Sequence, residues 1–155
     1  MATSSTAYTP DQLQELLVAG AVCTDRNNVR AAVHLITFTS LLHRQRFSEL
    51  LDVDDVDGPD GLRTTAAFVR DWRALPTSAA ADRLASGDQR LIALAVSLAT
   101  GEPVSLAANL AAGGHAYARR IIEAIAIATG YAEHYQINPT AKLHELLTAR
   151  DALLA

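Results

Sequence analysis

Apolar residues recur at helical spacing along almost the whole chain, and this periodicity is the feature that most limits its fold. Alternating β-branched segments, which would indicate strands, are nearly absent. Capping residues, glycines and prolines divide the pattern into eight expected helices. Their ranges are about 10–19, 27–51, 61–75, 78–85, 86–101, 104–112, 115–129 and 138–155. We therefore expect an all-α fold, a single compact bundle of about seven to eight helices.

The length of 155 residues suits one domain, so we expect residues 1–155 to form a single helical domain with a flexible N-terminus at 1–9. Five of the 17 acidic residues fall in the segment 52–60. We interpret this segment as an acidic loop between two helices, with Asp60 capping the second one. The rest of the chain, with 12 acidic and 13 basic residues, is nearly balanced in charge.

The helices at 86–101 and 115–129 are apolar around most of their circumference, which is typical of helices surrounded by protein. We expect them to pack against each other and to form the core. The residues expected to be nearly fully buried in the second helix are Ile121, Ile122 and Ile125. Their expected partners in the first helix are Leu91, Leu94, Ala95 and Leu98.

The sequence lacks the motifs that are typical of several classes of protein. The single cysteine, Cys23, cannot form an internal disulfide. No phosphate-binding glycine loop is present, and the pair His144-Glu145 is followed by Thr148 where a zinc protease motif needs a second histidine. No secretory signal and no apolar run of membrane-spanning length is visible. We expect a cytoplasmic protein with no cofactor and no membrane association.

The acidic segment is the weak candidate for a metal site. Asp52, Asp54 and Asp57 resemble the start of a calcium-binding loop. However, Val56 and Arg63 occupy positions where oxygen ligands are needed. A solvated loop explains the same residues more simply.

Arginines form the most organised polar pattern. On an expected helix at 61–75, Arg63, Arg70 and Arg73 would share one face, and Arg119 and Arg120 form a second basic pair. Guanidinium groups suit phosphates or the carboxylates of a partner protein. The alternative is a solvated helix face.

Aromatic and histidine side chains are the candidates for lining a pocket. His43 is in phase with Ile36, Phe47 and Leu50, so we expect it on the buried side of its helix. Alternatively, these side chains pack between helices and line no pocket. The full set of candidates is His43, Trp72, His115, Tyr117, Tyr131, His134 and Tyr135.

Three hypotheses of function follow. The first is a non-catalytic interaction protein, a small regulator or subunit that binds another protein and forms a possible homodimer, because half of the residues are hydrophobic. The second is a nucleic-acid-associated protein, since 104–129 has the length of a helix-turn-helix, although the second helix is apolar in its middle. The third is a small-molecule-binding or enzymatic helical bundle; the sequence favours a protein that is not an enzyme.

Overall fold

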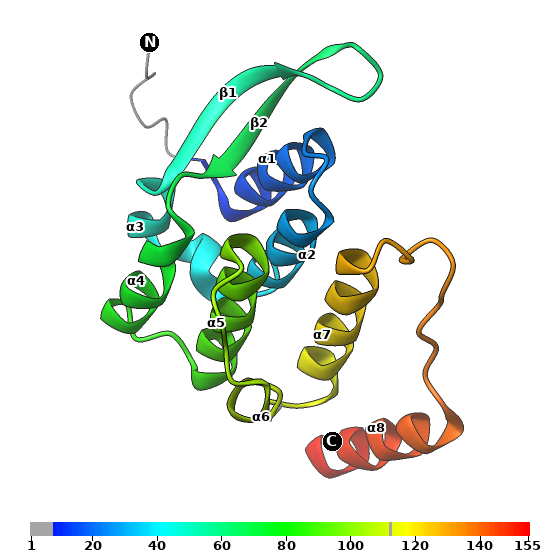
Figure 1. Ribbon diagram of the computed structural model, residues 1–155. Helices are drawn as coiled ribbons and strands as arrows, with labels where there is room; N and C mark the ends of the chain where they lie inside the picture. Colours follow the sequence, from blue (N-terminus) through cyan, green and yellow to red (C-terminus); the bar gives the residue numbers. More distant parts are fainter. Residues whose placement is uncertain (1–7, 112) are drawn as a thin grey trace.

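The computed structural model describes residues 8–111 and 113–155 (Figure 1). The prediction of a mostly helical chain is confirmed, but that of a purely α-helical one is wrong, because a two-stranded antiparallel sheet is present. The α-helices are α1 (Pro10–Cys23), α2 (Asn27–Ile36), α3 (Gln45–Ser48), α4 (Leu75–Ala81), α5 (Ser86–Thr100), α6 (Leu106–Asn109), α7 (His115–Ala128) and α8 (Ala141–Leu154). The strands are β1 (Leu51–Asp57) and β2 (Arg63–Val69), and two 3-10 segments are η1 (Ser40–His43) and η2 (Trp72–Ala74).

Helix α1 begins as its sequence predicts. The Thr9 hydroxyl accepts a hydrogen bond from the Gln12 backbone at 3.2 Å, and the Gln12 side chain accepts one from the Thr9 backbone at 2.9 Å. This reciprocal capping box satisfies two amides at the helix start. The expected flexible segment at 1–9 falls largely on residues 1–7, which lie outside the described residues.

The expected long helix at 27–51 is wrong, since α2 ends at Ile36 and only η1 and α3 follow before the sheet. Two threonine hydroxyls turn back onto the helix at this point. Thr37 donates to the carbonyl oxygen of Val33 at 2.9 Å, and Thr39 donates to that of Ile36 at 2.7 Å. Such local bonds compete with continuation of the helix. His43 is exposed in the segment after this break, so its predicted position on a buried side is wrong.

Most of the acidic segment is strand β1 and not an interhelix loop, and the expected helix at 61–75 is wrong, because β2 and η2 occupy most of that range. The two strands pair in register from Leu51 opposite Val69 to Asp57 opposite Arg63. The turn between them contains Pro59-Asp60-Gly61, with φ of +77° at the glycine. This tripeptide is a recognised turn signal and was available in the sequence.

The hairpin lies on α1 through β2, and Gly20 makes this contact possible (Figure 1). A Cβ atom at Gly20 would stand 2.2 Å from the carbonyl oxygen of Ala67. The expected helix range of about 10–19 is too short, because α1 continues through Gly20 to Cys23. The glycine is therefore a point of close approach between helix and strand, inside the helix.

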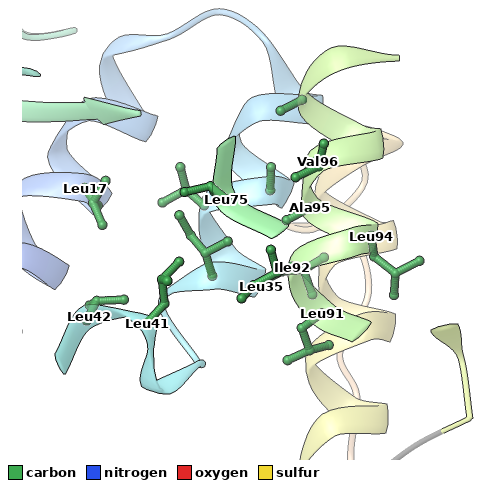
Figure 2. Packing of buried hydrophobic residues seen from close by; sticks show 14 of the residues in the cluster. Leu17, Leu35, Leu41, Leu42, Leu75, Leu91, Ile92, Leu94, Ala95 and Val96 are labelled. Atoms are coloured by element: carbon green, nitrogen blue, oxygen red, sulfur yellow. The ribbon is translucent and has the colours of Figure 1, made fainter. Parts of the chain in front are cut away.

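The core surrounds α2, which packs against α1, α5 and α7. Ala31 and Ala32 are fully buried, and their small side chains let neighbouring helices approach closely. Figure 2 shows the leucine-rich cluster that this packing creates between α2, η1, α4 and α5. The largest side chains with almost no exposure are Leu17, Leu35, Ile36, Leu41, Phe47, Leu75, Leu91 and Ile92.

The expected core face of α7 is only partly right. Ile121 is 7% exposed and Ala124 is 1% exposed, but Ile122 and Ile125 are 51% and 54% exposed, so their predicted burial is wrong. The physical reason is that α7 packs mainly on α2 and makes little contact with α5. One side of the helix is covered, and the side with Ile122 and Ile125 is not.

Several helix boundaries shift from expectation. Pro76 lies in the first turn of α4 instead of preceding it, and α6 is a single turn. Ser86 is the first residue of α5 and makes no capping bond. Within the described ranges, none of the helices has the length and hydropathy required to cross a membrane.

We expect Gly20→Ala to lower the free energy of unfolding by about 1–3 kcal/mol, as overpacking does, because the new methyl group meets backbone that cannot rotate away. Helix propensity alone predicts the opposite sign, a gain of about 1 kcal/mol. Urea denaturation of the variant and of Gln14→Ala, an exposed control on the same helix, measures the difference. A stabilised Gly20→Ala protein would contradict the close packing of α1 on β2.

Candidate functional site

A buried carboxylate attaches the start of α7 to the core. Asp88, 5% exposed, accepts hydrogen bonds from the backbone amide and the hydroxyl of Ser40 at 3.0 and 2.7 Å, and from the Tyr117 hydroxyl at 2.8 Å. The bond to the carboxylate is the main cause that raises the pKa of Tyr117. Asp88 thus joins η1, α5 and α7.

Arg120 makes the second polar attachment of α7. Its Nε donates to the carbonyl oxygen of His34 at 2.7 Å, and its Nη2 donates to the Thr37 hydroxyl at 3.1 Å. The guanidinium also lies 5.6 Å from the ring centre of Phe38. Arg120 therefore satisfies a carbonyl at the C-terminal end of α2, where helical carbonyls lack internal partners. Burial lowers the pKa of Arg120.

A pocket of about 430 Å³ lies beside this attachment, between α2, α7 and the segment that follows α7. His34 lies with its Nε2 3.6 Å from Oε1 of Glu123, and Arg119 lies with its Nε 3.9 Å from the other carboxylate oxygen. The far wall comes from residues 135–138. The pocket thus combines one imidazole, one carboxylate and one guanidinium.

His34 is the unusual group in this pocket. Its Nε2 is buried and makes no hydrogen bond to the described residues. Burial and the nearby charge of Arg120 hold the pKa of His34 below its ordinary value of 6.5, although Glu123 opposes them. The imidazole is therefore neutral at neutral pH.

Two potential metal ligands, His34 and Glu123, face each other, and the described residues contain no cluster of three or more His, Cys, Asp or Glu arranged to hold a metal ion. Of the weak candidates, Asp52 and Asp54 lie on one face of β1, and Asp57 lies on the other because strand side chains alternate.

The structure separates the arginines that were expected to share a helix face. Arg63 begins β2, Arg70 follows its other end about 20 Å away, and Arg73 lies in η2. Each has an acidic partner: Asp57 for Arg63, Asp52 for Arg70 and Glu102 for Arg73. The expected single basic face on a helix is wrong. Arg119 and Arg120 are neighbours on α7, and Arg120 is hydrogen-bonded to residues at the C-terminal end of α2.

The candidates for lining a pocket are spread over several elements. His43 borders a second pocket, of about 540 Å³, with Arg44, Arg46 and Asp82, and Trp72 packs against the core. The other candidates lie along α7 and after it. Tyr117 faces Asp88, His115 is exposed at the start of α7, Tyr131 and His134 contact each other with ring centres 5.5 Å apart, and Tyr135 lines the His34 pocket.

Sequence reasoning missed His34, Glu123 and Asp88 as parts of one connected region. No local spacing joins Asp88 to Ser40, which is 48 residues away. His34 and Glu123 meet only because α2 packs on α7. The hydrophilic residues within the apolar stretches of α2 and α7 were the one available signal.

A second feature is the uncovered apolar surface of the C-terminal third. Within the described residues after Gly101, only Ile121 and Ala124 belong to the buried core. Helix α8 has no buried residue and is set apart from the other helices (Figure 1). The large apolar side chains exposed in this part are Leu106, Leu110, Ile122, Ile125, Tyr131, Tyr135, Leu146, Leu153 and Leu154.

Comparison with known proteins finds no matching family model, no similar curated protein and no similar solved structure.

We expect Asp88→Ala to lower the free energy of unfolding by about 1–3 kcal/mol, because it leaves the Ser40 amide without its partner. Tyr117→Phe removes one bond to the carboxylate and should cost about 1 kcal/mol. Thermal melts check both, with the exposed Tyr131→Phe as the matched control. Equal melting temperatures for Tyr117→Phe and the control would show that the bond to Asp88 does not stabilise the fold.

The lowered pKa of His34 predicts a pH dependence. The folded state disfavours the protonated imidazole. The contribution of His34 to the free energy of unfolding is therefore at its maximum above pH 6.5, and it is lost as the pH falls because the unfolded state then binds a proton more readily. Between about pH 8 and about pH 5, the wild-type protein should lose more stability than His34→Gln does. Denaturation at a series of pH values measures this, with the exposed His144→Gln as control. If the stability of the wild type and of His34→Gln fell in parallel with pH, the lowered pKa of His34 would be contradicted.

Proposed function

We propose that this chain is a non-catalytic interaction protein, a small regulator or subunit whose binding surface is formed by α7 and α8. The observation that carries the proposal is helix α8, which has 14 residues, five leucines and no buried side chain. An isolated helix of this length is marginal in water, and helices in proteins are stabilised mainly by packing of an apolar face. A partner that covers the leucines supplies this packing.

The distribution of exposed residues supports the same function. Exposed apolar residues scattered singly are normal, but a contiguous group marks an interaction surface. In this chain nearly all of the buried core lies before Gly101, and five of the exposed leucines and isoleucines lie on α7 and α8. The apolar character of this surface favours a protein partner.

The positions of the arginines give less support to nucleic-acid binding. Arg63, Arg70 and Arg73 are paired with carboxylates, and Arg120 is bonded to the end of α2. A phosphate would have to displace these partners. The apolar side of α7 that is exposed also lacks the polar side chains that read base edges.

Site-specific photo-crosslinking tests the proposed function. A photoreactive amino acid replaces Ile125 or Leu146 in the full chain, and Leu62, an exposed residue of the hairpin turn, serves as the control. In cells that produce the chain naturally, we expect discrete protein adducts at positions 125 and 146 and none at 62. An absence of adducts at 125 and 146, or equal labelling at all three positions, would overturn the proposal.

A further inference from the structure

We propose that the pocket beside His34 is a binding site for a zwitterionic small molecule, an α-amino acid with an apolar side chain. This inference does not depend on the proposed interaction function, because the pocket lies between α2, α7 and residues 135–138. Its volume of about 430 Å³ falls within the usual range for sites of small ligands. The charges and the apolar surface that line the pocket identify its occupant.

The carboxylate of Glu123 is the group in the pocket that needs a cation. Its oxygens lie 3.6 Å from Nε2 of His34 and 3.9 Å from Nε of Arg119, and both distances are longer than a hydrogen bond. Because His34 is neutral at neutral pH, the imidazole does not balance the negative charge. An ammonium group of a ligand supplies the charge-assisted hydrogen bonds that these two neighbours do not.

Arg119 supplies the opposite charge one helical turn away. Its side chain is 54% exposed, and its contact with Glu123 is a loose surface pair that contributes little to stability. The neighbouring Arg120, in contrast, is bonded to His34 and Thr37. The guanidinium of Arg119 is therefore the one that can bind the carboxylate of a ligand in its fork of N–H donors.

The arrangement of these two charges favours a zwitterion over an ion of one sign. The charges of Arg119 and Glu123 add to zero, so a neutral ligand with one positive and one negative group satisfies both. In an α-amino acid these groups are separated by a single carbon atom, so they can reach two side chains that are themselves in contact. A metal ion would find His34 and Glu123 alone, because the described part of the chain offers no group of three suitable ligands.

The apolar wall of the pocket indicates which side chain the ligand carries. Ala126 and Ile127 of α7, with Ala132 and Ile137 of the segment after it, line the pocket beside the charged groups. An aliphatic side chain gains from contact with this wall because its apolar surface leaves water. An inorganic anion would leave the wall unused.

Isothermal titration calorimetry of the full chain tests the site with leucine and three analogues. Leucinamide lacks the carboxylate, N-acetyl-leucine lacks the ammonium group, and glycine lacks the aliphatic side chain. We expect leucine to bind saturably and each analogue to bind at least about tenfold more weakly, because each loses one class of contact. An absence of saturable leucine binding, or an analogue that binds as tightly as leucine, would overturn the proposal.

Variants of the charged residues locate the binding. Glu123→Gln and Arg119→Gln should each weaken leucine binding at least about tenfold. Glu133→Gln and Arg150→Gln make the same changes at exposed positions outside the pocket and should leave binding unchanged. Thermal melts verify that all four variants fold. Leucine affinity that is unchanged in a folded Glu123→Gln or Arg119→Gln protein would contradict the assigned site.

Nuclear magnetic resonance of the histidine side chains gives an independent readout. The imidazole signals of His34 should shift when leucine is added, and those of the exposed His144 should not. Binding that leaves the His34 signals in place would show that the ligand lies elsewhere. These outcomes are separate from photo-crosslinking at positions 125 and 146, so either proposal can fail while the other stands.

Discussion

The packing of small side chains on α2 is the constraint on which the rest of the structure depends. Ala31 and Ala32 are fully buried, and they let α5 and α7 approach α2 from different sides while α1 contacts it as well. A larger residue at either position would separate helices whose contacts make up most of the core. The end of α2 at Ile36 is equally important, because the turn that follows supplies Thr37, Phe38 and Ser40 to the attachments of α7.

Local features of the sequence predict the helices whose start and end signals are strong. The capping box at Thr9 and the left-handed Gly101 after α5 place these boundaries correctly because the signals involve neighbours in sequence. The hairpin was missed because Ala66 and Ala67 in β2 favour a helix when they are considered alone. Their burial against α1, which decides the strand, depends on a glycine more than 40 residues away.

The residues of the candidate site were even less predictable from local sequence than the hairpin was. The His34 pocket and the Asp88 contacts join α2, η1, α5 and α7, which are distant in the sequence. No spacing rule connects such residues before the helices are packed. The exposure of Ile122 and Ile125 has the same origin. Periodicity identifies the apolar sides of α7, but it does not determine which side a neighbouring helix covers.

The attachment of α7 has a consequence for how the protein loses structure. Its fully buried apolar side chains are Ile121 and Ala124, while Tyr117, Ile127 and Ala128 are partly buried against the core and Tyr117 and Arg120 add hydrogen bonds. Regions held by few buried apolar contacts open at a lower free energy than the core does. We therefore expect the stretch from α7 to the C-terminus to open more readily than α2 and α5, so that its amides exchange with solvent sooner than theirs.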